Sequence, residues 1–145
     1  MRDSLTSAVA KRVLSPKAAV TDNTAYVGEV IDHQGFDSAT YHILIGANTD
    51  ANATFAVLLE ESDASGSGFG AVADADMVSQ TPASAPETAA AFTAADDDNK
   101  VRSIGYVGQK RYTRLTITPT GNDSGNHFVA ATCVLGHAAH LPISR

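Results

Sequence analysis

The sequence contains no tryptophan and a single cysteine, Cys133, among its 145 residues. One cysteine cannot form a disulfide within the chain, so no disulfide framework stabilises the fold. Cys133 lies in the apolar run 128–135, which predicts a buried, unreactive thiol in a strand. No apolar run reaches the roughly 20 residues of a transmembrane helix, and the N-terminus lacks the apolar core of a signal peptide. We therefore expect a protein made in a reducing cytoplasm, without a membrane partner.

Basic residues are missing from the middle of the chain. Between Ala18 and Asn99 there is no lysine or arginine, against fourteen acidic residues, and the formal net charge of the whole chain is −6. Nucleic-acid binding requires a broad basic face, so we expect no nucleic-acid partner. The basic residues gather in residues 1–17 and 100–119, and this segregation suits contacts between complementary patches, within the fold or between copies. The alternative is solvated surface charge without a dedicated partner.

Motifs for catalysis and cofactor binding are also lacking. The chain has no P-loop, no GxGxxG and no GxSxG elbow. His137 and His140 have HxxH spacing but lie in a Gly/Ala/Pro tail, and a zinc site needs further ligands on a fixed scaffold. Asn48, Asp50 and Asn52 alternate like calcium ligands, without the glycine and glutamate of an EF-hand loop. We expect a protein that is not an enzyme and has no cofactor, and a weak ion site in the Asp-rich loops is left open.

The chain is organised around residues 100–119, where pattern and charge coincide. The spacing predicts two strands joined by a turn at Gly108–Lys110, a hairpin that Pro119 ends. In the second strand Thr113, Leu115 and Ile117 alternate with polar residues, as in a half-buried strand. The same stretch holds five of the ten basic side chains.

About eight short strand-like segments separated by turn-rich sequence predict an all-β fold. Connections 61–70 and 79–87 are long enough to cross between sheets, so we expect an antiparallel β-sandwich of jelly-roll type, with an immunoglobulin-like sandwich as the alternative. The period-two alternation predicts a core that contains Ile43, Val57, Leu59, Leu115, Ile117 and Val134.

We divide the chain into a basic N-terminal arm, residues 1–17, and a β-sandwich domain, residues 18–145. In the arm, Leu5, Val9 and Val13 recur at helical spacing, which predicts a short amphipathic helix that ends before Pro16. A helix with so little apolar surface is marginal alone. We therefore expect an arm that becomes ordered against a partner.

A resemblance to a known family is carried by residues 101–117, with IGY at 104–106 followed by KRYTRL at 110–115. This stretch, the basic N-terminal segment and the Ala/Pro-rich end 136–142 resemble a family of small tailed-bacteriophage virion proteins associated with capsid genes. The resemblance implies a capsid decoration, or cement, protein that binds the outside of the capsid. It also implies a small β-rich domain that works as a symmetric oligomer without catalytic residues.

The partners expected from the resemblance and the charge pattern are the major capsid protein and further copies of the chain, as a homotrimer or alternatively a dimer. The protein would be made in the host cytoplasm and located at the capsid surface of the virion. Of Arg111 and Arg114, we expect one to pair with the acidic body of the chain, for example near Asp96–Asp98, and the other to face a neighbouring subunit. The residues expected to contact the capsid or a subunit are Arg2, Lys11, Arg12, Lys17, Lys110, Arg111 and Arg114.

Two other functional classes are compatible with a β-sandwich. A tail, fibre or lectin-like module would bind a receptor or a glycan, usually through exposed aromatic side chains, and this chain has no tryptophan. A small enzyme of the cupin type would need His and Glu ligands on facing strands, whereas the histidines here fall mainly in turns and in the tail. The capsid decoration role is therefore the principal hypothesis.

Overall fold

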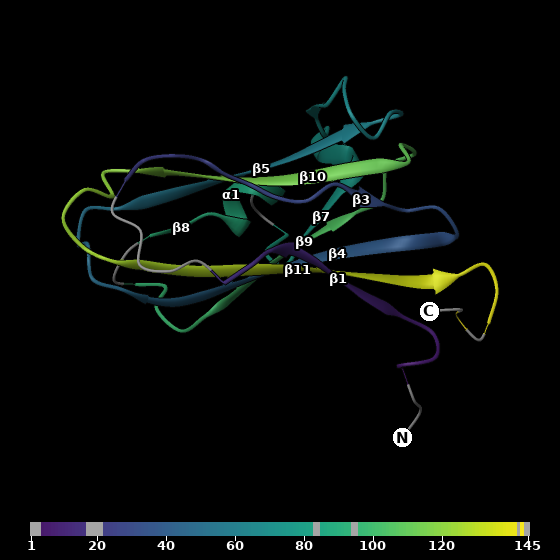
Figure 1. Cartoon of the computed structure of the whole chain (residues 1–145), viewed down its shortest axis with the longest axis horizontal. Helices are drawn as coiled ribbons and strands as arrows, with labels where there is room; N and C mark the ends of the chain where they lie inside the picture. The colour runs from purple at the N-terminus through teal and green to yellow at the C-terminus, as the bar shows by residue number, and fades with distance from the viewer. Residues whose placement is uncertain (1–3, 17–21, 83–84, 94–95, 142, 144–145) are drawn as a thin grey trace.

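The computed structural model describes residues 4–16, 22–82, 85–93, 96–141 and 143. Two antiparallel sheets pack face to face, which confirms the predicted all-β sandwich (Figure 1). The five-stranded sheet has the order β1 (Val9–Leu14), β11 (His127–Ala138), β4 (Phe36–Asn48), β9 (Val101–Tyr106) and β7 (Met77–Ser79). In the six-stranded sheet, β10 (Tyr112–Thr120) lies between β2 (Tyr26–Val27) and β5 (Thr54–Ser62), β3 (Ile31–Asp32) also pairs with β10, and β6 (Gly70–Ala71) and β8 (Phe92–Thr93) pair with β5.

Successive long strands alternate between the two sheets. Along the chain, β4, β9 and β11 belong to the five-stranded sheet, whereas β5 and β10 belong to the six-stranded sheet. This winding is that of a jelly roll, while an immunoglobulin-like sandwich joins several consecutive strands within one sheet. The two strands predicted in residues 100–119 are present as β9 and β10, but the predicted hairpin is wrong. The turn carries the chain from one sheet to the other, so β9 pairs with β4 and β10 pairs with β5.

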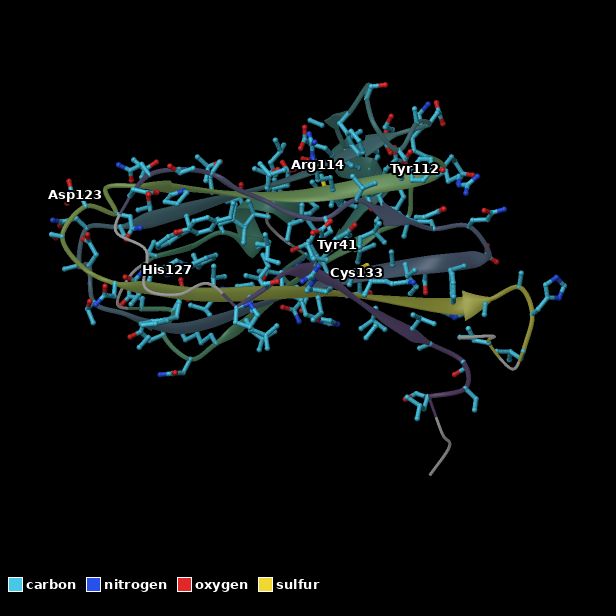
Figure 2. All side chains as sticks on the ribbon, viewed as in Figure 1. Tyr41, Tyr112, Arg114, Asp123, His127 and Cys133 are labelled. Carbon is cyan, nitrogen blue, oxygen red and sulfur yellow. The ribbon has the colours of Figure 1, made fainter. Side chains whose placement is uncertain are left out.

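The core lies between the sheets and is filled by alternate residues of the long strands. Of the six predicted core residues, Ile43, Val57, Leu59, Leu115 and Ile117 are buried. The prediction that Val134 belongs to the core is wrong. Its neighbours Cys133 and Leu135 point inward, and Val134 is only partly buried. Every residue from 128 to 135 is apolar or small apart from Thr132, so alternation alone did not identify the inward face. Figure 2 shows Tyr41 and Cys133 between the two sheets.

The predicted helix in residues 1–17 is wrong, because Val9–Leu14 forms strand β1 at the edge of the five-stranded sheet. β1 pairs antiparallel with β11, and an irregularity in register between Arg12 and Leu14 allows two consecutive residues to face the core. Val13 and Leu14 are 1% and 6% exposed. Hydrogen bonding to a long neighbouring strand thus outweighs a helical pattern that is too short to be stable alone.

One side of the sandwich is closed by a segment that contacts both sheets. The Gly28 N–H donates to the Leu115 carbonyl at 2.8 Å, and the Glu29 N–H donates to the Val13 carbonyl at 2.9 Å. A Cβ atom at position 28 would lie 2.7 Å from the Leu115 oxygen and 2.8 Å from Val13 Cγ1. Only glycine therefore allows the backbone to come this close to both strands.

Two short helices complete the described structure, the 3₁₀ helix η1 (Asp74–Asp76) and α1 (Pro86–Ala90). Strand β8 follows α1 after one residue and contains the buried Phe92. Helix α1 is fixed to the six-stranded sheet because Glu87 Oε1 accepts the Leu59 N–H at 2.7 Å. Neither of the described helices has the length and apolar character required to cross a membrane.

Candidate functional site

The structure describes five of the seven basic residues predicted to contact a partner. Arg2 and Lys17 lie outside the described residues. Lys11 and Arg12 are exposed on β1 of the five-stranded sheet, whereas Lys110, Arg111 and Arg114 lie in or just before β10 of the six-stranded sheet. The five side chains therefore come from different sheets, and their contact with a capsid or a second subunit stays a prediction.

Arg114 pairs with an acidic residue on the adjacent strand. Its register partner on β5 is Glu60, and the Arg114 Nε and Nη2 groups donate to the two carboxylate oxygens, each at 3.1 Å. The guanidinium also lies over the Phe69 ring, 4.4 Å from its centroid. Figure 2 shows Arg114 on the outer side of the six-stranded sheet. This side chain thus fastens the acidic loop after β5 to the sheet.

Arg111 pairs with the turn between β3 and β4. Its Nε and Nη2 groups donate to Asp32 at 2.9 and 2.7 Å, and Nη2 also donates to Gln34 at 2.6 Å. The predicted pairing with the acidic body is confirmed, since Asp32 and Glu60 both belong to it. The suggested place near residues 96–98 is wrong, because Asp97 pairs with Lys100 and Arg102. Both arginines lie close to other acidic residues in space, and the register that brings them there cannot be inferred from spacing along the chain.

A cleft of about 630 Å³ opens at the end of the sandwich where β10 begins. One wall is the turn that leads into β4, and the other is the connection from β9 to β10. The turn depends on Gly35, whose φ of +86° suits glycine, and on Asp32 Oδ1, which accepts the Gln34 N–H at 2.9 Å. The residues that line the cleft are 33, 34, 36–39 and 106–111.

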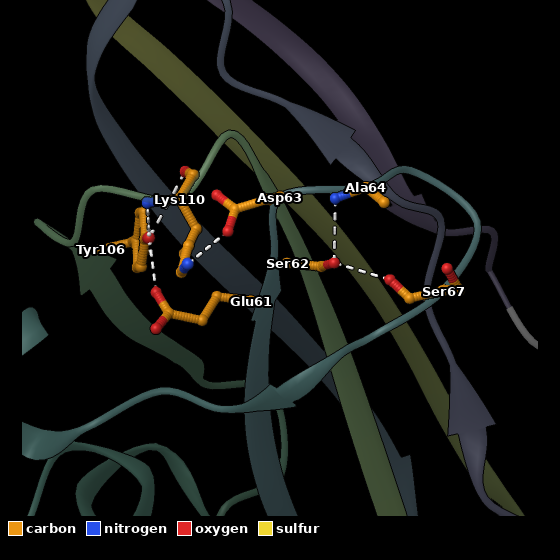
Figure 3. A network of polar contacts seen from close by, with 7 residues as sticks. All are labelled: Glu61, Ser62, Asp63, Ala64, Ser67, Tyr106 and Lys110. Carbon is orange, nitrogen blue, oxygen red and sulfur yellow. Dashed lines mark hydrogen bonds and ion pairs between the residues drawn. The ribbon is translucent and has the colours of Figure 1, made fainter.

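Hydrogen bonds hold the walls of the cleft in place. His33 packs edge-on against Tyr106, 5.1 Å between centroids, and its Nε2 lies 2.6 Å from Thr113 Oγ1. The Tyr106 hydroxyl donates to Glu61 Oε2 at 2.6 Å and accepts the Lys110 N–H at 2.8 Å (Figure 3). The Lys110 ammonium in turn pairs with Asp63, as Figure 3 also shows. The cleft is therefore a fixed polar hollow.

The two cations that line the cleft, Lys110 and Arg111, are both paired within the chain, and Asp37 adds a carboxylate to the lining. Burial lowers the pKa of His33 below its usual value of 6.5, against the opposing effect of Asp32. The hydrogen bond from Arg111 lowers the pKa of Asp32, and burial followed by the bond to Glu61 raises the pKa of Tyr106. Each cation at the rim is thus paired with a carboxylate of the same chain, and this arrangement suits a neutral polar ligand better than a phosphate.

Asp50 has a structural role that the sequence did not reveal. Its side chain is buried, and Oδ2 accepts the N–H groups of Asp123, Ser124 and Gly125 at 3.0, 2.9 and 3.3 Å. Oδ1 accepts the Asn52 N–H at 3.1 Å, and these bonds lower the pKa of Asp50 to about 2. The sequence did not reveal this role, because Asp123, Ser124 and Gly125 lie more than 70 positions from Asp50 along the chain. Among the residues that the structure describes, no group of three or more His, Cys, Asp or Glu side chains could hold a metal ion.

Neither a family model nor a curated protein matches the chain. Among solved structures, the chain is similar over its whole length to the PBSX exported protein XepA, with a TM-score of 0.57 and 15% identity. The chain spans 42% of the length of XepA. The SPBc2 prophage-derived protein YomS is 11% identical over 88% of this chain and 91% of YomS, with a TM-score of 0.45. The likeness to XepA concerns the fold and agrees with the sandwich described above.

Proposed function

We propose that this chain is a structural phage virion protein that decorates and stabilises the outside of the capsid as a symmetric homo-oligomer. The observation that carries the proposal is the place of residues 101–117, the stretch that resembles small phage virion proteins. It supplies β9, between β4 and β7 in one sheet, and most of β10, between β2 and β5 in the other. The resemblance therefore involves an inner strand of each sheet together with the connection between them.

The physical character of the domain supports this role. Surface cations such as Lys110 and Arg111 are paired with acidic residues of the same chain, which leaves a compact module with an acidic exterior. A capsid presents many equivalent positions, so a symmetric module bound at each of them gains strength from many weak contacts. The fold shared with XepA, an exported protein, is consistent with a module that acts outside the cell that makes it.

Cosedimentation with empty capsids tests the proposal. Purified protein is mixed with capsids of the phage that encodes it, and the pelleted fraction is measured against total protein. We expect saturable binding at a fixed number of copies per capsid. The proposal would be contradicted if the protein stayed in the supernatant while the capsids pelleted, or if it pelleted only with isolated tails.

The cleft favours a second candidate function, a tail, fibre or lectin-like module that binds a receptor or glycan. Its fixed polar walls and internally paired cations suit sugar hydroxyl groups, with Gln34 and Gln109 among the side chains that line it. A glycan array tests this candidate. Two results together would favour glycan or receptor binding over capsid decoration. The wild-type protein would bind a specific glycan and not capsids, and the Gln109→Ala variant would lose the glycan binding.

A further inference from the structure

The outer side of the five-stranded sheet carries no formal charge over four of its strands. On β11, β4, β9 and β7, the residues that alternate with the buried ones include no Asp, Glu, Lys or Arg among those that the structure describes. We call this surface the neutral face, and the side chains that characterise it are His42, Leu44, Val78, Val101, Phe128 and Ala130. In a chain with a net charge of −6, such an area is unusual.

Large apolar side chains are exposed on the neutral face. Leu44 lies directly between its register partners Ala130 and Val101, and Leu44 and Val101 are 43% and 55% exposed. Phe128 is 41% exposed and covers Gly46, where an added Cβ atom would lie 3.0 Å from Phe128 Cβ. A shallow hollow of about 270 Å³ lies over this cluster, lined in part by Leu44 and Phe128. Contiguous apolar surface of this kind marks an interaction site.

The outer side of the six-stranded sheet differs. Its β10 and β5 strands expose the pair formed by Arg114 and Glu60, which is charged and already satisfied. Leu58 is exposed on the same side to 37%, close to the exposure of Leu44, but its register partner there is Thr116 and not an apolar residue. The two outer faces therefore offer a natural comparison, one neutral and apolar, the other charged.

We propose that two copies of this chain meet face to face through the neutral face, related by a two-fold axis. In a two-fold contact the same patch of both copies meets, so a charged side chain near the axis would lie close to the identical charge of the partner and be repelled. The neutral face avoids that repulsion, whereas contacts through the acidic remainder of the surface would not. The proposal rests on the proposed function, because it specifies how copies of a symmetric virion protein would associate.

The size of the neutral face agrees with a dimer. Neighbouring strands lie about 4.8 Å apart and rise about 3.3 Å per residue. With these spacings, the outer side of β4, β7, β9 and β11 has an area of about 500 Å² per copy. Two copies would bury about 1,000 Å² in total, at the lower end of specific protein interfaces. The dimer is favoured over the homotrimer predicted from charge segregation, because Arg12, Arg111 and Arg114 pair within the chain and are not left for head-to-tail contacts.

Sedimentation equilibrium of matched lysine variants tests the proposal. Wild-type protein, Leu44→Lys and Leu58→Lys are compared at about 100 µM, a concentration at which an interface of this size is expected to be populated. Both substitutions replace an exposed strand leucine and make the net charge less negative, so general repulsion decreases equally in the two variants. We expect dimers for wild type and Leu58→Lys, and a dissociation constant at least about 100-fold higher for Leu44→Lys. Circular dichroism and the melting temperature establish that each variant is folded, and Val101→Lys replaces Leu44→Lys if the latter is not.

Three outcomes would overturn the proposal. They are a monomeric wild-type protein, equal weakening by the Leu44 and Leu58 substitutions, or an oligomer that neither substitution changes. Capsid cosedimentation of the same variants separates this proposal from the proposed function. Capsid binding by a protein that stays monomeric leaves capsid decoration intact and rejects the dimer, while loss of binding by a monomeric Leu44→Lys variant alone would assign the face to the capsid and not to a second copy.

Discussion

His127 lies in the core with its ring stacked on Phe55, 3.9 Å between centroids, and close to the rings of Tyr26 and Phe92. The side chain is fully buried, and neither ring nitrogen has a hydrogen-bond partner among the described residues. Figure 2 shows it between the sheets, near the end that carries Asp123. Burial lowers its pKa from 6.5 to about 4, against the opposing effect of Asp98. The sequence placed His127 beside a strong strand but gave no sign of this aromatic cluster.

The free energy of unfolding should fall on acidification because of His127. Below pH 6.5 the unfolded chain binds a proton at this histidine, whereas the buried ring in the folded chain stays neutral until about pH 4. The contribution of His127 to the free energy of unfolding is therefore fully retained above pH 6.5 and decreases as the pH falls towards 4. We expect a loss of about 2–3 kcal/mol from this residue across that window, measured by urea unfolding at each pH. His127→Phe should retain the ring stack and reduce the slope.

A residual slope is expected in the His127→Phe variant, because burial also lowers the pKa of His33. Equal slopes in wild type and His127→Phe would show that the buried ring does not control acid stability.

Substitution of Leu115, near the centre of β10, tests which face of the strand points into the core. Its side chain is fully buried between the sheets, so Leu115→Ala should lower the free energy of unfolding by about 2–5 kcal/mol. Leu58→Ala on the outer side of the same sheet is the matched control, because that leucine is 37% exposed, and it should cost less than about 1 kcal/mol. Chemical denaturation measures both, and similar losses would contradict the assignment of the inward face.

Strand β1 shows how an element can differ from its sequence pattern. Its Val9 and Val13 fit a helical period, yet the segment pairs with β11 and contributes Val13 to the core. We expect deletion of residues 1–14 to lower the melting temperature substantially or to prevent folding, since the sheet loses an edge strand and buried apolar surface. Deletion of residues 1–7, which ends before β1, is the control and should have a small effect. A normal melting temperature after the longer deletion would contradict the role of β1.

The strands themselves could be predicted, but their partners could not. Alternation identified the inward residues of β4, β5 and β10, including Ile43, Leu59 and Leu115, because each strand carries its own period of two. Pairing is a property of two segments, and the turn at Gly108–Lys110 is equally compatible with a hairpin and with a crossing between sheets. The connection from β9 to β10 makes that crossing, and the structure alone shows it.

For the whole molecule, the segregation of charge along the chain does not persist in space. The basic residues near β10 meet acidic residues of the chain's middle, as in the pairs of Arg111 with Asp32 and Arg114 with Glu60. The sequence allowed for contacts within the fold or between copies, and for these two arginines the described contacts are within the fold. The neutral face could not be foreseen, because its apolar residues are scattered over four strands and become one surface only in the folded sheet.

The most direct test of the proposed role is a cryo-electron microscopy difference map between capsids with and without the bound protein. The account predicts additional density on the outer surface of the shell, at symmetry-equivalent positions, with the shape of a β-sandwich. Density restricted to the neck or tail, or no additional density at saturating protein, would contradict capsid decoration.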